Sequence, residues 1–263
     1  METVTSADGT AIAFDQLGSG SALILVSGAS CDRAVDAAIA EALAQEFTVL
    51  NYDRRGRGDS TDTPPYAVER EIDDLEVLLA AAGGTAALVG LSSGGVLAAH
   101  AAASGLPVSD LVMWEPPVRL DAEGQRQTKD YHASLAALLA DGRRGDALAL
   151  FMGMVGMPAE MVAGMRQSSP YWAAGEALAP TLAYDATVMG DGSLPTDAFS
   201  RITVPAMVLA GGASPEWLRE SARAVAAAIP GARYGVLDGQ THDVAADVLA
   251  AAVRDFAAPR LRA

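Results

Sequence analysis

Residues 86–100, which read AALVGLSSGGVLAAH, constrain the fold more than any other stretch of the chain. The segment opens with an apolar run typical of a buried strand and closes with the Ala/Leu content of a helix. Between them, residues 90–94 read GLSSG, a Gly-x-Ser-x-Gly pattern that fits a sharp strand-to-helix turn. Glycine is needed there because a Cβ would clash where backbone meets backbone. We therefore predict a strand, a tight turn with Ser92 at its apex, and a helix.

Apolar runs alternate with helical periodicity on both sides of this turn. Strands are expected at residues 3–5, 11–14, 22–26, 47–52, 86–90, 110–114, 204–210 and 234–237. Helices are expected at residues 33–45, 67–82, 215–228 and 242–257, besides the one after the turn. Such alternation predicts an α/β fold with a mostly parallel sheet and helices on both faces.

The alternation lapses between residues 118 and 200, where the chain reads as helical and rich in methionine. We therefore expect a core formed by residues 1–117 and 201–263, with a helical cap at 118–200 inserted after the strand that ends near Trp114. The insert should lie over the carboxyl ends of the strands, where open α/β sheets bind ligands.

Composition narrows the class of partner. The 263 residues are 51% hydrophobic, which is enough for a large core, and no long apolar run predicts a membrane span. The formal net charge of -15 makes nucleic acid and anionic membranes poor partners. Cys31 is the single cysteine and the N-terminus lacks a signal-peptide pattern, so we expect a cytoplasmic protein. The three histidines have no metal-ligand spacing, and we expect neither a metal nor a cofactor.

A serine nucleophile needs a base within hydrogen-bond reach. His242 follows the last expected strand, where a base could approach Ser92 from the sheet edge. His100 lies about two helical turns beyond the serine and should be structural. His132 falls in the insert, where we expect it at the surface or in the cap.

Three features together make the chain resemble an α/β-hydrolase-fold protein with a cap insert. They are the GLSSG turn, the sequence DRRGRGDS at residues 53–60, and His242 before the last helix. The resemblance covers nearly the whole chain. It implies a serine-nucleophile hydrolase in which Ser92 attacks the substrate and His242 accepts the proton.

The same resemblance implies an oxyanion hole formed by the backbone N–H groups of Ala29 and Ser93. Here the chain departs from the family, because Ser27-Gly28-Ala29 stands where His-Gly is usual. A loop that presents a backbone N–H does not require the histidine side chain.

The triad acid is the second departure from the family pattern. The family usually carries Asp in the loop after the strand at 204–210, but this loop reads GGASPE. Some members, the haloalkane dehalogenases among them, carry the acid at the end of the strand after the elbow helix, where this chain has Glu115. The order Ser92, Glu115, His242 also agrees with the family, so we predict Glu115 as the acid. The alternatives are Glu216, Asp238 and Asp243.

Other charged groups have mainly structural interpretations. Glu115 could instead form a salt bridge, for example with Arg119. The loop at 53–60 is expected to be chiefly architectural, with a substrate-carboxylate role as the alternative for its arginines. These are Arg54, Arg55 and Arg57.

The expected pocket combines residues of the oxyanion loop with flexible apolar residues of the insert. Its predicted members are Gly28, Cys31, Met152, Met154 and Trp172. Cys31 should be a small wall residue, and the set favours a small hydrophobic substrate. The predicted function is hydrolysis of an ester or related acyl bond through an acyl-enzyme on Ser92. The alternatives are a non-hydrolytic acyltransferase, lyase or cyclase, and a binding protein without catalysis.

Overall fold

The computed structural model describes residues 1–261, with side chains for residues 1–257. Its strands are β1 (Glu2–Thr5), β2 (Ala11–Gly18), β3 (Ser21–Val26), β4 (Phe47–Tyr52), β5 (Ala86–Leu91), β6 (Val108–Trp114), β7 (Ala206–Gly211) and β8 (Arg233–Leu237). They form one sheet in the order β1-β2-β4-β3-β5-β6-β7-β8. The pairings that involve β2 are antiparallel and all others are parallel, which confirms the predicted mostly parallel sheet.

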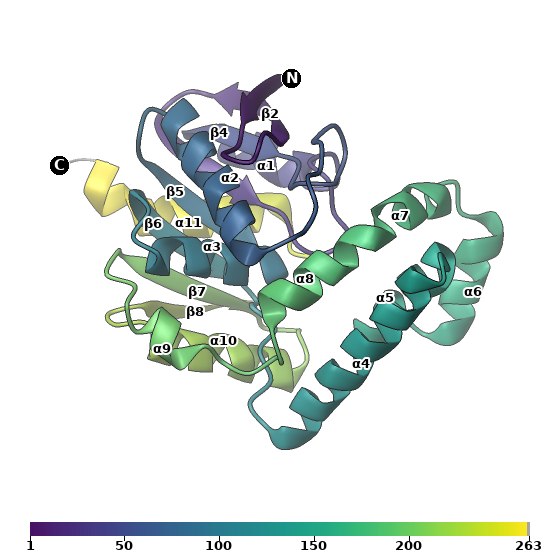
Figure 1. Ribbon diagram of the computed structural model, residues 1–263. Coiled ribbons are helices and arrows are strands. Elements are labelled where there is room, and N and C mark those ends of the chain that lie inside the picture. The colour runs from purple at the N-terminus through teal and green to yellow at the C-terminus, as the bar shows by residue number, and fades with distance from the viewer. Residues whose placement is uncertain (262–263) are drawn as a thin grey trace.

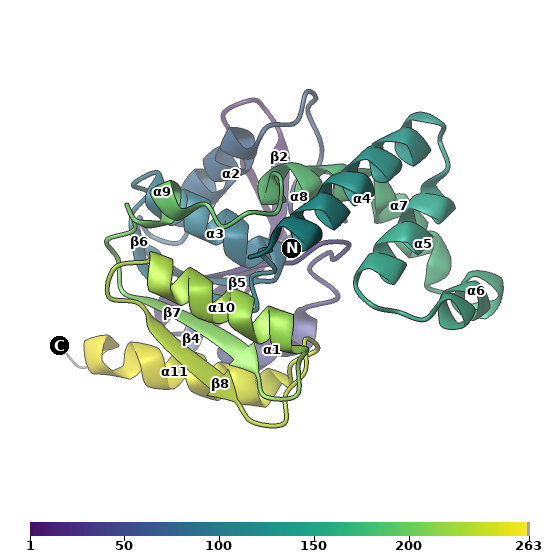
Figure 2. The same cartoon turned by 90° about the horizontal axis from the view of Figure 1, so that it is seen from below.

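Helices cover both faces of this sheet (Figures 1 and 2). The helices of the core are α1 (Ala37–Leu43), α2 (Val68–Ala81), α3 (Ser93–Ala103), α10 (Glu216–Ala228) and α11 (Ala246–Leu261). Leu78, Val96 and Val225 bring α2, α3 and α10 into one buried apolar cluster. Leu43 and Val253 bring α1 and α11 into a second cluster on the opposite face. This arrangement is the predicted α/β architecture.

Two helix starts differ from the expectation. The helix expected from residue 33 begins at Ala37, because the guanidinium of Arg33 is held by Asp15 and Asp59 in a turn outside the helix. The last helix begins at Ala246 rather than at His242. The carbonyl of His242 instead accepts a hydrogen bond from the indole N–H of Trp114, at 2.9 Å, which keeps this residue in the loop.

Between β6 and β7 the chain forms a helical insert, defined here by the following elements. They are α4 (Ala122–Ala140), α5 (Arg144–Met154), α6 (Ala159–Ser168), α7 (Trp172–Leu178), the short 3-10 helix η1 (Ala179–Thr181), α8 (Leu182–Met189) and α9 (Thr196–Phe199). In Figure 1, α4 to α7 extend away from the sheet, whereas α8 returns towards α3. Leu135, Leu148 and Leu182 give the insert an apolar core of its own. None of the helices in the described part of the chain combines the length and apolar character needed to cross a bilayer.

Candidate active site

Ser92 occupies a strained turn between β5 and α3. Its φ of 53° and ψ of -121° are unusual for a residue with a side chain, and its N–H donates to the carbonyl of Trp114 at 2.8 Å. The flanking glycines allow the close packing that holds this turn. A Cβ on Gly90 would lie 2.5 Å from the carbonyl oxygen of Gly94, and a Cβ on Gly94 would lie 2.3 Å from that of Val26. The Gly-x-Ser-x-Gly pattern is therefore a packing requirement of this fold.

The carboxylate of Glu115, directly after β6, connects two elements at the carboxyl edge of the sheet. It is fully buried, with its Oε1 accepting from the N–H of Gly211 at 2.7 Å. Its Oε2 lies 2.7 Å from Nδ1 of His242. This contact favours the imidazole tautomer with a proton on Nδ1, which leaves Nε2 free as an acceptor.

The hydrogen bonds around Glu115 also determine its charge. Burial alone would raise the pKa of this carboxyl, but hydrogen bonding from His242, the nearby Ser214 hydroxyl and the N–H of Gly211 hold the pKa below its ordinary value. Glu115 is therefore ionised at neutral pH. Three other carboxylates considered from the sequence are exposed and make no hydrogen bond to His242 within the described residues. They are Glu216, Asp238 and Asp243.

The loop after β3 lies against the serine. A Cβ on Gly28 would be 3.4 Å from the Cβ of Ser92, so this loop approaches the turn closely. The carbonyl of Gly28 accepts from Nη1 of Arg57 at 2.6 Å. In a trans peptide the carbonyl and the next N–H point in opposite directions, so the N–H of Ala29 faces away from Arg57. Both N–H groups predicted for the oxyanion hole belong to residues that line one cavity with Ser92, namely Ala29 and Ser93.

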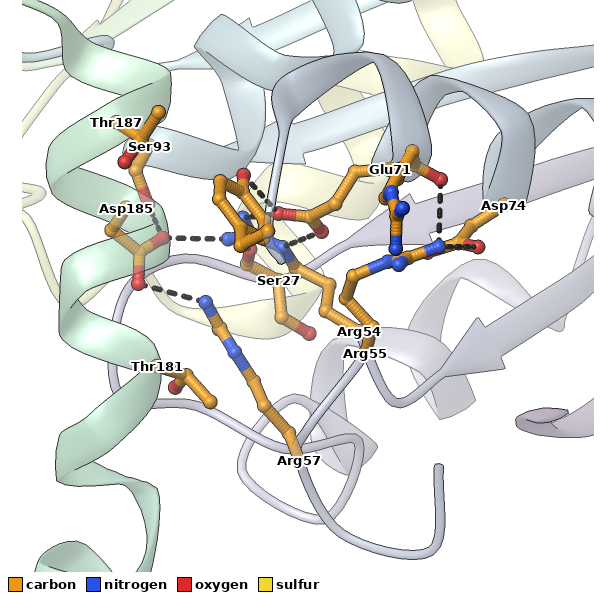
Figure 3. A network of polar contacts seen from close by, with 12 residues as sticks. Ser27, Arg54, Arg55, Arg57, Glu71, Asp74, Ser93, Thr181, Asp185 and Thr187 are labelled. Carbon is orange, nitrogen blue, oxygen red and sulfur yellow. Dashed lines mark hydrogen bonds and ion pairs between the residues drawn. The ribbon is translucent and has the colours of Figure 1, made fainter. Parts of the chain in front are cut away.

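A buried ion-pair network connects the helical insert to this loop and to α3 (Figure 3). Asp185 on α8 accepts from Arg54 at 2.7 Å and from the hydroxyl of Ser93 at 2.9 Å through one oxygen. Its other oxygen accepts from Arg57 at 2.7 Å. Arg54 also forms a bidentate salt bridge with Glu71, through hydrogen bonds of 2.8 and 2.6 Å. Although burial opposes its charge, the guanidinium groups of Arg57 and Arg54 hold the pKa of Asp185 below its ordinary value. The arginines therefore bind carboxylates of the protein itself.

A cavity of about 900 Å³ opens between the strand ends and the insert, and both Ser92 and His242 line it. Of the pocket residues predicted from the sequence, Gly28, Cys31 and Met154 line this cavity. Burial raises the pKa of the Cys31 thiol to about 12, which fits an unreactive wall residue. Apolar side chains of the core and of the helical insert complete the cavity wall. They include Ile39, Leu91, Trp114, Phe151, Leu182 and Leu218.

The predictions for Met152 and Trp172 are wrong, because neither side chain lines the cavity. Trp172 is buried in the apolar core of the insert, where its indole N–H donates to Glu176 at 2.8 Å. Met152 packs against the same core and does not line the cavity, whereas its neighbour Phe151 contacts the core and also lines the cavity. His132 does lie in the insert, but it lines the cavity.

Comparison with known proteins identifies the family. A family model described as "Alpha/beta hydrolase family" matches residues 23–257. The chain belongs to the alpha/beta hydrolase family. An alpha/beta hydrolase from Sphaerobacter thermophilus is 51% identical, with 97% of this chain and 99% of that chain covered and a TM-score of 0.88. A thermophilic esterase from Thermogutta terrifontis is 26% identical, with 98% and 96% covered and a TM-score of 0.69. The comparison with curated proteins gives no match.

These likenesses make the chain an enzyme of the hydrolase type. An enol-lactonase from Burkholderia xenovorans, 23% identical over 98% of this chain and 100% of that chain with a TM-score of 0.65, shares the fold of this alpha/beta hydrolase. Sequence reasoning missed Asp185 and Trp217 and considered Arg119 only as a partner of Glu115, although all three residues line the cavity. The one available signal was the run of three arginines, because buried guanidinium groups require carboxylates.

Among the described residues of this alpha/beta hydrolase, no group of three or more His, Cys, Asp or Glu side chains is arranged to hold a metal ion. His100 lies on α3 with its ring edge-on to Phe199, at 5.8 Å between ring centroids. Burial lowers the pKa of His100, which favours the neutral ring. Its contacts agree with a structural role.

Proposed function

We propose that this alpha/beta hydrolase cleaves carboxylic esters of small, largely hydrophobic molecules through an acyl-enzyme on Ser92. The observation that carries the proposal is the placement of a strained, glycine-flanked serine in one cavity with a histidine whose Nδ1 is bonded to a buried carboxylate. A serine, a base and an acid that orients the base are the groups that acyl transfer requires. The mostly apolar wall favours a hydrophobic acyl or alcohol group.

In the proposed reaction, Oγ of Ser92 attacks the ester carbonyl carbon while Nε2 of His242 accepts the hydroxyl proton. The N–H groups of Ala29 and Ser93 stabilise the negative oxygen of the tetrahedral intermediate. When the carbon–oxygen bond of the ester breaks, His242 donates its proton to the leaving alcohol. Water then attacks the acyl-enzyme and loses a proton to His242. The bond between Oγ of Ser92 and the acyl carbon breaks, His242 returns the proton to Oγ, and the carboxylic acid product leaves. Throughout, ionised Glu115 orients the ring and stabilises the imidazolium.

The domain division belongs to the same proposal. We propose that residues 118–200 form a cap over a core of residues 1–117 and 201–263, and that the cap excludes water from the acyl group. Support comes from the cavity, because its wall combines residues of both parts. The contacts of Asp185 with Arg57 and Ser93 would keep this cap in register with the reacting groups.

The experiment is hydrolysis of 4-nitrophenyl esters of increasing acyl length by the wild type and the Ser92→Ala variant. Wild type should turn over these esters, and Ser92→Ala should fall to the background rate. Ser104→Ala is a matched control, because this exposed serine caps the far end of α3, where its hydroxyl donates to the carbonyl of Ala101. It should retain full activity. Undiminished hydrolysis by folded Ser92→Ala would refute the serine mechanism and favour the transferase, lyase or cyclase alternative.

A further inference from the structure

The cavity contains a guanidinium group that forms no ion pair with any described side chain. Arg119 lies between β6 and α4 and lines the same cavity as Ser92 and His242. Its guanidinium carbon stands 3.7 Å from the ring centroid of Trp217, which belongs to α10. Within the part of the chain whose side chains are described, Arg119 forms no ion pair and its guanidinium donates no hydrogen bond.

The carboxylates that line the cavity or lie close to Arg119 in sequence form no ion pair with it among the described side chains. Glu115, the partner considered from the sequence, is bonded to His242 and to a backbone N–H. Asp185 is bonded to two other arginines. Asp121, close in sequence, caps α4 by accepting from a backbone N–H at 2.7 Å, and its charge opposes the effect of burial on the pKa of Arg119 without forming an ion pair with it. Asp36 also lines the cavity, and burial raises the pKa of its carboxyl.

The guanidinium of Arg119 is partly removed from water, and a bound anion would offset the free-energy cost of its charge. Burial lowers the pKa of its guanidinium, which is the sign of a cation that has lost part of its hydration. The cation–π contact with the face of Trp217 offsets part of this desolvation cost. This stacking also fixes the plane of the guanidinium, while its N–H donors at the edge remain open. A planar fork of donors in this state matches a carboxylate, which it can bind through two parallel hydrogen bonds.

We propose that Arg119 and Trp217 form a subsite for an anionic group of the substrate, and that this group is a carboxylate. The inference rests on the proposed ester hydrolysis at Ser92 and names its substrate class. That class is esters whose acyl chain ends in a carboxylate at the end remote from the scissile bond. The apolar wall would contact the carbon chain between the two ends. Arg119 also gives the cavity a local positive charge in a protein of net charge -15.

The test compares two matched sets of esters. One set contains 4-nitrophenyl monoesters of linear dicarboxylic acids with six to eight carbons, and the other contains the esters of monocarboxylic acids of the same lengths. Wild type should show a higher kcat/KM for the charged member of at least one pair. The length at which this preference is greatest measures the span from Ser92 to Arg119.

Arg119→Gln should reduce the preference for the charged ester by about tenfold to a hundredfold, because a hydrogen bond to a charged group is lost. Its kcat/KM for the uncharged esters should change much less than its kcat/KM for the charged esters, and Arg119→Lys should retain part of the preference. The matched control is Arg223→Gln, because Arg223 also lies over an aromatic ring, that of Tyr234 at 5.3 Å, but does not line the cavity. It should behave as wild type.

No preference in the wild type, or an unchanged preference in folded Arg119→Gln, would overturn the subsite. If neither set of esters is hydrolysed, the proposed function at Ser92 fails instead. Calorimetric titration with the free dicarboxylate that has seven carbons then decides the subsite independently of turnover. Binding that is lost in Arg119→Gln supports it, and equal binding or none in the wild type overturns it.

Discussion

Substitution of Asp185 by asparagine should destabilise the protein strongly. Asp185 is 5% exposed and neutralises both Arg54 and Arg57, each at 2.7 Å. Breaking a buried ion pair by removing one partner costs about 3–5 kcal/mol. Arg54 would keep its pair with Glu71, and Arg57 would keep the carbonyl of Gly28, so we expect the lower end, about 3 kcal/mol. At roughly 2–4 °C per kcal/mol, the melting temperature should fall by about 6–12 °C.

The same substitution should also lower the catalytic rate. Arg57 holds the carbonyl of Gly28, and this contact orients the N–H of Ala29, which belongs to the same peptide group. Because Asp185 holds Arg57 and the hydroxyl of Ser93, its loss should loosen both sides of the oxyanion hole. Complete removal of one oxyanion donor costs about 10²–10³ in kcat, so a loosened pair should cost about tenfold. KM should change little, because the ground-state ester does not need these donors to the same extent.

Urea unfolding followed by circular dichroism measures the stability, and ester hydrolysis under conditions where the variant is folded measures kcat and KM. The control is Asp74→Asn. Asp74 is as deeply buried and pairs with Arg55 at 2.8 and 2.7 Å, but this pair makes no contact with the oxyanion loop. Asp74→Asn should lose stability without losing kcat. Equal kcat values in the two variants would refute the role of Asp185 in the oxyanion hole. A decrease in the free energy of unfolding below about 1 kcal/mol in Asp185→Asn would refute its role in stability.

Three further predictions follow from the geometry. Glu115→Gln should lower kcat/KM for ester hydrolysis by about 10³–10⁴-fold while Glu216→Gln leaves it unchanged; the opposite pattern in steady-state kinetics would reassign the acid. The pKa values of Glu115 and Asp185 are held low, so their contribution to folding is complete above about pH 4 and is lost as the pH falls through their folded-state values. Urea unfolding measured from pH 7 to pH 3 should therefore show that the free energy of unfolding falls more steeply with acidification in the wild type than in Asp185→Asn. Equal slopes in the two proteins would contradict this. Gly94→Ala should cost about 3 kcal/mol or more, because its Cβ would lie 2.3 Å from a backbone oxygen, whereas Gly164→Ala on α6, with open space around it, should be neutral or stabilising in thermal melts.

The parts of the fold that local patterns determine were predictable from the sequence. The apolar run, the two close-packed glycines and the Ala-rich segment at residues 86–100 predict a strand, a turn and a helix, and β5 and α3 confirm them. The expected length of the helix at residues 33–45 is wrong at its start. Periodicity alone does not reveal that Arg33 is held by acids from two other segments.

Long-range pairs explain most of what the sequence did not reveal. Asp185 is a single carboxylate in a helical insert, 128 positions from Arg57, and no local pattern connects the two. The contact of Arg119 with Trp217 similarly joins the start of the insert to α10. Met152 and Trp172 were assigned to the pocket because composition does not distinguish the face of a helix that meets its own insert from the face that meets a cavity. Residue type identified the chemistry, whereas the orientation of each helix required the structure.

The most direct test of the central claim is covalent labelling of the nucleophile. A fluorophosphonate reacts with an activated serine, and peptide mapping by mass spectrometry locates the adduct. We expect one adduct per chain on Ser92, absent from Ser92→Ala and much slower to form in His242→Ala. An adduct on Ser93 or another serine, or no adduct on the folded wild type, would contradict the assignment of Ser92 as the nucleophile.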